Sequence, residues 1–356
     1  MAEATGRTAL RAALDRVPLF GSSAVLSSAA ESAVRLAGLT NVNWLVADHK
    51  GARYVVRLPG TGTSQYIDRR AEEVAARSAA DAGVNADVVF FDPSDGLMLT
   101  RFVDGAATMD AARFASDHSA VARAGEVFRR LHTTARPFAA DFTLFPMIDE
   151  YKALLADKGA TLPDGYEVVQ DSAGAVRAAL EAHPVPLVAS HCDPLCENFL
   201  DTGERMYLID YEYAGNNDPM WDLGDLSVEG AFTAEQDDVL LRAYFGGAPP
   251  ADQVGRMVAY KALCDLLWTL WGVIQHVNGN PADDFWAYAV GRFERCQALM
   301  SSPAFADHIA TIGTGPESDD VAEFLRTVHA RQPHDSGLAD FVAEQRAGEV
   351  EPDRWG

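Results

Sequence analysis

Lysine and arginine are scarce in this sequence. The 356 residues contain 29 Lys and Arg against 52 Asp and Glu, which gives a formal net charge of −23. Proteins that bind nucleic acid depend on clustered basic side chains, which replace counterions along the phosphate backbone. The composition therefore argues against nucleic acid as a partner, and the excess of carboxylates favours a small cationic molecule at long range.

Cysteine is also rare. The four cysteines form no CxxC pair of the kind that suits zinc or redox chemistry, and their sparse use is typical of reduced cytosolic thiols: Cys192, Cys196, Cys264 and Cys296. Nothing in the sequence indicates the oligomeric state.

Long hydrophobic runs are missing as well. Charged residues interrupt the first twenty positions, which excludes the apolar core of a signal peptide. The most apolar late stretch, residues 266–277, contains polar residues and is too short to span a bilayer. We therefore expect a cytoplasmic protein that does not insert into a membrane.

Short β-rich runs alternate with turn residues between positions 31 and 102. Three runs, centred on residues 34, 45 and 56, predict antiparallel strands, and helix-forming residues follow over 67–82. Two further runs flank the turn-forming segment 92–96 and predict another hairpin. The sequence thus predicts a small antiparallel β-sheet lobe with one helix over residues 31–102, preceded by an N-terminal extension of residues 1–30.

Helical periodicity dominates after residue 102. Two β-rich segments, 187–190 and 206–209, interrupt it, and helical patterns resume from 234 to about 312. We predict a larger, mainly helical lobe over residues 103–313, and hence an α+β fold with two lobes. The polar tail 314–356 is predicted to be a peripheral appendage or partly disordered.

The strongest motif lies between the two β-rich segments of the helical lobe. His191, Asp193 and Asn198 form an H-x-D-x-x-x-x-N string, the spacing of a kinase catalytic loop. Phosphoryl transfer needs a carboxylate that orients the attacking hydroxyl and accepts its proton, which is the role predicted for Asp193. Asn198 and Asp210, seventeen positions after Asp193, are predicted to bind Mg²⁺ through oxygen atoms.

A simpler interpretation is that these residues only form loops and caps, since His, Asp and Asn are common in turns. Their order, the flanking strands and the preceding β-sheet lobe together favour the kinase interpretation. His191 itself is predicted to be a structural hydrogen-bonding residue rather than a proton carrier.

The small lobe contains the residues predicted to bind the nucleotide. Kinases place a cation on the third strand to hold the phosphates and an acid on the next helix to position it, and Arg57 and Glu72 occupy those places. A turn of small polar residues that could cover the phosphates contains Thr40, Asn41 and Asn43. The alternative for Arg57 and Glu72 is that both are exposed surface charges.

Residues 210–223, DYEYAGNNDPMWDL, resemble the second motif of the choline/ethanolamine kinase family, of the bacterial choline kinase type. The resemblance extends from about residue 35 to 300 and includes segments 38–43, 54–58, 266–271 and 284–288. This family lies within the aminoglycoside phosphotransferase and protein-kinase-like superfamily. The resemblance implies a two-lobed protein-kinase-like fold that uses ATP and Mg²⁺.

The resemblance also implies an aromatic cage for the substrate. A trimethylammonium group has no hydrogen to donate, so it is best held by aromatic faces, and choline recognition is an established use of such cages. The family's cage positions fall here on Tyr213, Trp268, Trp271 and Tyr288. Trp268 and Trp271 share one helix face by their spacing, although aromatic residues at helical spacing are often core residues. Asp193 would bind the substrate hydroxyl and take its proton.

Two acidic residues, Asp222 and Asp225, match a superfamily motif that supports the active site. A helix N-cap is an equally good explanation for them, so neither is assigned a catalytic role.

These features predict an ATP- and Mg²⁺-dependent kinase that converts choline to phosphocholine. Ethanolamine, another small amino alcohol or an amino sugar is the alternative acceptor, because a primary ammonium would need oxygen acceptors in place of aromatic faces. A catalytically inactive kinase-like binding module is the alternative of another class. The sequence leaves the choice between ATP and GTP open.

Overall fold

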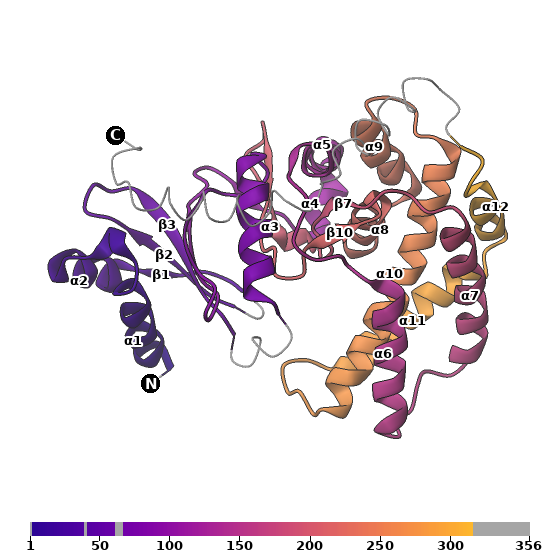
Figure 1. Cartoon of the computed structure of the whole chain (residues 1–356), viewed down its shortest axis with the longest axis horizontal. Coiled ribbons are helices and arrows are strands. Elements are labelled where there is room, and N and C mark those ends of the chain that lie inside the picture. Colours follow the sequence, from indigo (N-terminus) through magenta and orange to yellow (C-terminus); the bar gives the residue numbers. More distant parts are fainter. Residues whose placement is uncertain (1, 39–40, 61–66, 316–356) are drawn as a thin grey trace.

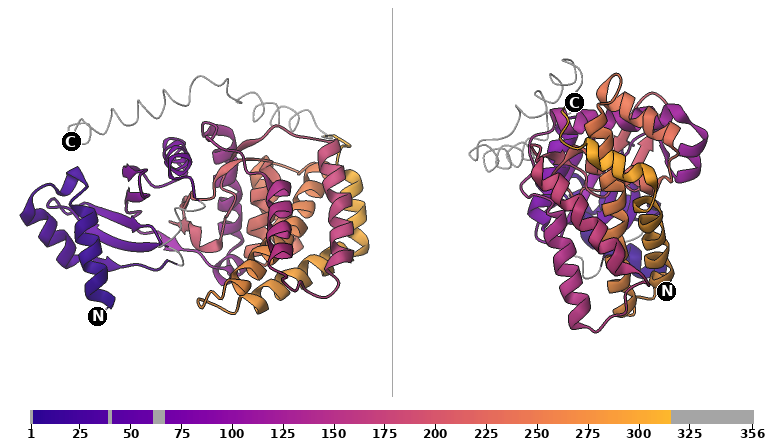
Figure 2. Two further views of the ribbon diagram at one scale, coloured as in Figure 1. Left: turned by 60° about the horizontal axis from the view of Figure 1, so that its bottom comes forward. Right: turned by 90° about the vertical axis from the view of Figure 1, so that its right-hand side faces the viewer.

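A computed structural model describes residues 2–38, 41–60 and 67–315 of the chain. An N-terminal lobe built on a β-sheet lies beside a larger lobe of helices, and the two are distinct in Figure 1 and in the left view of Figure 2. The predicted tail, 314–356, lies outside the described residues except for its first two positions. The lobe boundaries at 30, 102 and 313 stay predictions.

The N-terminal lobe contains a five-stranded antiparallel sheet in the order β1-β2-β3-β5-β4. Its strands are β1 (Val34–Arg35), β2 (Val42–Ala47), β3 (Arg53–Leu58), β4 (Val88–Asp92) and β5 (Leu97–Arg101). One helix, α3 (Arg69–Asp81), connects β3 to β4 and begins at Asp68, whose side chain accepts hydrogen bonds from two backbone N–H groups. These strands and this helix confirm the predicted β-sheet lobe.

Alternation along the strands divides the side chains between the two faces of the sheet. Trp44, Tyr54, Val56 and Leu99 belong to a core on one face, whereas Met98 belongs to the core that contains α3. The register pairs Arg57 of β3 with Met98 of β5, so Arg57 lies on the α3 side. That side faces the helical lobe (Figure 1).

The segment predicted as an N-terminal extension covers the other face of the sheet. It contains α1 (Ala2–Leu14), the short 3₁₀ helix η1 (Pro18–Phe20) and α2 (Ser23–Ser32). Leu10, Leu14 and Phe20 are almost fully buried in the same core as Trp44 and Val56. The segment is therefore part of the lobe's hydrophobic core, which its weak hydrophobic pattern did not reveal.

The larger lobe is mainly helical, as predicted. Its helices are α4 (Ala111–Ser116), α5 (His118–Thr134), α6 (Leu144–Asp157), α7 (Tyr166–Ala182), α8 (Pro219–Glu229), α9 (Ala234–Phe245), α10 (Ala251–Val277), α11 (Phe285–Met300) and α12 (Pro303–Thr311). The long helix α10 packs against α6, α8, α11 and α12. It is the central helix of this lobe.

By length and composition alone, helix α10 could cross a membrane. It extends fifteen residues before the apolar run 266–277 on which the sequence-based expectation rested. However, 83% of its apolar window is buried within the fold. The hydrophobic character of α10 is thus explained by its position in the core, as for the core helix of a soluble protein.

Very short strands frame the loops of the larger lobe. β6 (Ala107–Thr108), β8 (Phe199–Asp201) and β9 (Met206–Leu208) form one antiparallel sheet, and β7 (Val188–Ser190) pairs with β10 (Gly215–Asn217) in another. The β-rich patterns predicted β7 and β9. β6, β8 and β10 are only two or three residues long and depend on pairing with distant segments, so no local pattern marks them.

Candidate active site

The predicted catalytic loop lies between β7 and β8. The side-chain nitrogen Nδ2 of Asn198 donates to the backbone carbonyl of Asp193 at 3.1 Å. The backbone N–H of Ile209 donates to the carbonyl of Asn198 at 3.0 Å, and Nε2 of His191 lies 2.8 Å from the carbonyl of Ile209. These contacts connect Asp193 and Asn198 to Ile209, the residue before Asp210, and the structural role predicted for His191 is confirmed.

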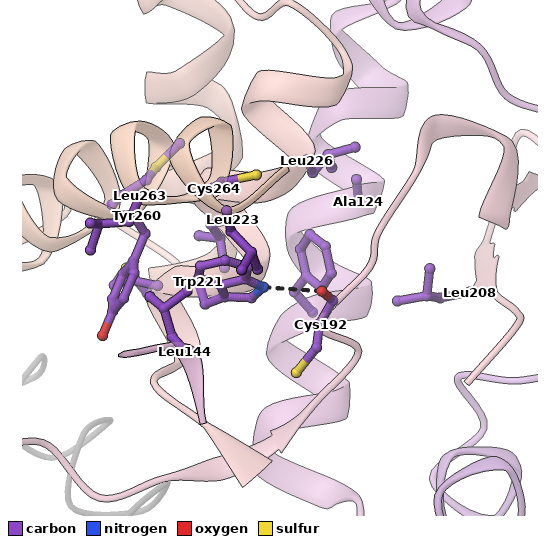
Figure 3. Close-up of a cluster of buried hydrophobic side chains, with 14 of the residues drawn as sticks. Ala124, Leu144, Cys192, Leu208, Trp221, Leu223, Leu226, Tyr260, Leu263 and Cys264 are labelled. Atoms are coloured by element: carbon purple, nitrogen blue, oxygen red, sulfur yellow. Dashed lines mark hydrogen bonds between the residues drawn. The ribbon is translucent and has the colours of Figure 1, made fainter. Parts of the chain in front are cut away.

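The buried side chain of Asp222 binds the backbone of this loop. Its carboxylate accepts hydrogen bonds from the backbone N–H groups of His191 (2.7 Å) and Cys192 (2.8 Å), and Nε2 of His132 lies 3.1 Å from it. Cys192 has a left-handed backbone with φ of 67°, and its carbonyl accepts a hydrogen bond from Nε1 of Trp221 (Figure 3). Asp222 and Trp221 thus stabilise the strained conformation immediately before Asp193.

The N-cap explanation for Asp222 and Asp225 is wrong. The N-cap of α8 is Asp218, whose side chain accepts from the N–H of Met220, so Asp222 and Asp225 lie inside the helix. Asp222, Asp225 and Glu229 recur at spacings of three and four residues, which places them on one face of α8. This spacing was the signal in the sequence for an acidic helix face.

The electrostatic environment of Asp193 is strongly acidic. Burial, together with the nearby carboxylates of Glu229, Asp210 and Glu212, raises its pKa to about 8. A cation that entered the site would lower this pKa, because opposite charge favours the ionised form of a carboxyl group. A bound cation would therefore favour the ionised form of Asp193.

Arg57 and Glu72 form a buried ion pair, so the alternative of exposed surface charges is wrong. The guanidinium group of Arg57 also contacts Asp210 at 3.2 Å and donates to the backbone carbonyl of Gly96 at 3.1 Å. The cation of the small lobe and the acid on α3 therefore meet the carboxylate of the larger lobe in one network.

A second contact between the lobes is centred on Glu212. Its carboxylate accepts hydrogen bonds from Nδ2 of Asn41 at 3.3 Å and from Arg69 at 3.4 Å. Burial is the main cause that raises the pKa of Glu212, and nearby Asp210 adds to it. Glu212 and Arg69 were not assigned roles from the sequence, because only the assembled lobes bring them together.

The turn residues differ in what they contact. Asn41 is buried, and its oxygen Oδ1 accepts from the backbone N–H of Gly60 at 3.3 Å. Nδ2 of Asn43 donates to the carbonyl of Ala37 at 3.1 Å and closes the turn, and a Cβ atom on Gly38 would lie 2.8 Å from that nitrogen. Thr40 lies outside the described residues.

The four aromatic residues predicted from the resemblance form one cluster. The ring centroids of Tyr213 and Trp268 are 6.5 Å apart, those of Trp268 and Trp271 are 5.9 Å apart, and those of Trp271 and Tyr288 are 5.9 Å apart. All three pairs are edge-to-face, and all four side chains are half-buried rather than fully buried. Phe285 completes the cluster, 5.5 Å from Trp271.

A close helix contact sets the position of Tyr288. Gly272 of α10 lies against α11, and a Cβ atom there would be 2.9 Å from the ring of Tyr288. The guanidinium of Arg292 lies 5.0 Å from the centroid of that ring and binds Glu229 at 2.5 Å and Asp265 at 3.3 Å. Tyr288 is therefore held between a glycine contact and a buried arginine.

Oxygen atoms available to a divalent cation converge near Asp210. Ligand atoms of Glu72, Asp210 and Glu212 lie within 4.8 Å of one another, and the side chain of Asp210 is 30% exposed. Nδ2 of Asn198 is used by the carbonyl of Asp193, which leaves its amide oxygen as the atom for a cation. This set of oxygen donors fits Mg²⁺, which prefers carboxylate and carbonyl ligands.

The chain is similar to several known proteins. A family model described as the phosphotransferase enzyme family (APH) matches residues 33–256. A crystal structure of a choline/ethanolamine kinase family protein from Mesorhizobium loti is 51% identical, with a TM-score of 0.79, over 87% of this chain and all of that one. That of the choline kinase LicA from Streptococcus pneumoniae is 29% identical, with a TM-score of 0.63, over 76% of this chain and 93% of that one.

A protein compared by sequence alone is similar to this chain as well. Protein LicA from Haemophilus influenzae is 27% identical over 273 residues, which cover 74% of this chain and 78% of that protein. The fold, the assembled site and these similarities agree, and the chain therefore belongs to the phosphotransferase enzyme family and, within it, to the choline/ethanolamine kinase family.

Proposed function

We propose that this protein transfers the γ-phosphoryl group of ATP to the hydroxyl group of choline, in a Mg²⁺-dependent reaction. The observation that carries the proposal is the half-buried cluster of Tyr213, Trp268, Trp271 and Tyr288. Burial is the main cause that raises the pKa of Tyr288, and the negative charge of Asp193 adds to it. Because such an effect requires proximity, the aromatic cluster lies near Asp193, the predicted base. Aromatic faces beside a proton acceptor suit a quaternary ammonium alcohol.

Asp193 is proposed to orient the hydroxyl group of choline and to accept its proton as the oxygen attacks phosphorus. Its neighbours Glu229, Asp210 and Glu212 give the site negative charge that attracts the cationic substrate. In the proposed geometry the ammonium head contacts the aromatic rings, and the hydroxyl points to Asp193.

Arg57 is proposed to hold the phosphate oxygens of the nucleotide, with Glu72 fixing its guanidinium group. Asn41 and Asn43 would act by shaping the turn above the phosphates, because their side chains contact Gly60, Glu212 and Ala37. Thr40, which directly precedes Asn41 in the sequence, is also proposed to contribute to this site. An ATP-dependent reaction and four unpaired cysteines also support a cytoplasmic location.

Asn198 and Asp210 are the residues that would hold Mg²⁺. When bound, Mg²⁺ neutralises the negative charge of the phosphate oxygens during transfer. Asp210 has a left-handed backbone with φ of 70°, and its carboxylate contacts Arg57 at 3.2 Å. Its position lets one carboxylate serve both the phosphate-binding arginine and a cation.

The proposal is tested by measuring ADP release with a panel of acceptors. We expect choline and its partly methylated analogues to be phosphorylated with the highest kcat/KM, ethanolamine more slowly, and amino sugars not at all, because aromatic faces favour methylated ammonium groups. ADP release should stop when EDTA removes Mg²⁺. A lack of turnover with every amino alcohol, or a preference for amino sugars, would contradict the proposal.

Replacing Trp268 or Trp271 with Ala is expected to raise the KM for choline by about tenfold or more and to leave the KM for ATP unchanged. Each substitution removes one aromatic face from the head group. Trp286→Ala is the matched control, because Trp286 lies beside His276 and is not one of the four cage positions. An equal rise in both KM values, or none, would show that the cluster is only part of the core.

A further inference from the structure

The acidic face of α8 contains a carboxylate that the proposed mechanism does not use. Asp222 binds the catalytic loop, and Glu229 is paired with Arg292 at 2.5 Å. Asp225, between them, is 1% exposed. It has no ion pair among the described residues.

The surroundings of Asp225 leave one oxygen atom unsatisfied. The thiol of Cys264 donates to Oδ1 at 3.0 Å, whereas Oδ2 is buried and has no hydrogen-bond partner among the described residues. Burying a carboxylate without a partner lowers the stability of a fold, which favours a functional reason for keeping it. Burial, with Glu229 and Asp193 nearby, raises the pKa of Asp225 well above its usual value.

Asp225 contacts α10, the helix that contains Trp268 and Trp271. Cys264, Trp268 and Trp271 follow at spacings of four and three residues, so they share one face of α10. Because Cys264 contacts Asp225 directly, the carboxylate is about one helical turn below Trp268. Glu229 and Asp193 are among the nearby charged groups that act on Asp225. Arg292 pairs with Glu229 and also lies over the ring of Tyr288, which connects this cluster to the aromatic residues.

The chemistry of this cluster favours an ammonium group over a metal ion. Ligand atoms of Asp225, Glu229 and Cys264 lie within 4.8 Å of one another. However, Glu229 is neutralised by Arg292, and the thiol of Cys264 is a hydrogen-bond donor whose pKa is raised well above its usual value by burial. A protonated thiol is a poor metal ligand, which leaves Asp225 Oδ2 as the acceptor.

We propose that Asp225 is a specificity-determining residue of the acceptor site, whose free oxygen accepts a hydrogen bond from an ammonium group that retains an N–H. This inference rests on the proposed function. Choline has no such hydrogen and would gain only the attraction of the negative field. Ethanolamine and its mono- and dimethyl derivatives would gain a charge-assisted hydrogen bond. Asp225 would thus extend the range of acceptors beyond choline.

The experiment compares Asp225→Asn and Asp225→Ala with the unmodified enzyme at saturating ATP and Mg²⁺. The acceptors are choline, N,N-dimethylethanolamine, N-methylethanolamine and ethanolamine. We expect the KM for the three acceptors with an N–H to rise by about tenfold or more relative to that for choline. An equal change for all four acceptors, or no change, would overturn the inference.

Stability measurements separate this role from a structural one. Asp225→Asn keeps the shape and replaces a buried carboxyl group, whose charged form is disfavoured by burial, with a neutral amide, so we expect its melting temperature to be unchanged or higher. The matched control is Asp252→Asn, because Asp252 is also buried with one unpartnered oxygen but lies about 18 Å along α10 from Cys264. This control should leave the ratio of KM values unchanged. A large loss of stability in Asp225→Asn without a change in that ratio would show a structural role.

The test also distinguishes failure of the inference from failure of the proposed function. If the unmodified enzyme phosphorylates none of the four acceptors, the proposed function is wrong. Calorimetric titration of the same four amines then decides the inference. Asp225→Asn must weaken binding of the three amines with an N–H more than binding of choline, and any other result overturns the role of Asp225.

Discussion

Asp193→Asn is expected to lower kcat for phosphoryl transfer by about 10²–10⁴-fold. The amide has nearly the same shape as the carboxylate but cannot accept the proton of the attacking hydroxyl. The loop should keep its conformation, because Asn198 binds the backbone carbonyl of Asp193 and not its side chain. The loss is therefore predicted in the chemical step.

Nucleotide binding should survive in this variant. The groups proposed to hold the nucleotide are Arg57 and the turn of the small lobe, whereas Asp193 lies in the loop after β7 of the larger lobe. Single-turnover kinetics would measure the chemical step, and calorimetry would measure the Kd for ADP. Asp201→Asn is the control, because Asp201, at the end of β8, pairs with Arg123 of α5 and not with the nucleotide-binding groups. Near-normal turnover in Asp193→Asn would remove this residue as the base.

Asp222→Asn is expected to lower the free energy of unfolding by about 2–4 kcal/mol and kcat by about 100-fold. The carboxylate accepts hydrogen bonds from the backbone N–H groups of His191 and Cys192 through different oxygens. An asparagine places an NH₂ group against one of these donors. The left-handed backbone of Cys192 would then lose a partner, and Asp193 would shift.

Chemical denaturation followed by circular dichroism would measure the loss of stability, and steady-state kinetics would measure kcat. Asp237→Asn is a suitable control, because Asp237 is also a carboxylate between two partners, Ser227 and Lys261, but does not contact the catalytic loop. We expect the control to keep a normal kcat. Unchanged stability in Asp222→Asn would show that the loop does not depend on this carboxylate.

The placements that follow local rules were predicted correctly. The motif from His191 to Asn198 lies in a loop between two strands, and Arg57 and Glu72 meet because the third strand and the next helix are neighbours in the chain. Trp268 and Trp271 share a helix face because their spacing matches the helical repeat. In each case the arrangement depends on residues close in sequence, or on a recurrent packing of adjacent elements.

Other parts depended on contacts between distant segments. Asp222 was interpreted as a possible helix cap, but it binds backbone atoms about thirty positions earlier in the chain. The packing of α1 and α2 on the sheet was also missed, since Leu10 and Phe20 become core residues only when strands from later in the sequence cover them. Such contacts leave no periodic signal in the local sequence.

The sequence by itself therefore determined the two-lobed fold, and it led to the predictions that Asp193 and Asp210 serve phosphoryl transfer and, through the family resemblance, that four aromatic residues hold the acceptor. Only the tertiary structure decided which charges are paired and which are not. Glu229 is neutralised by Arg292 from α11, whereas Asp225, one helical turn earlier, keeps a free oxygen. Burial and long-range pairing set the state of a carboxylate, and both are properties of the folded chain rather than of its order of residues.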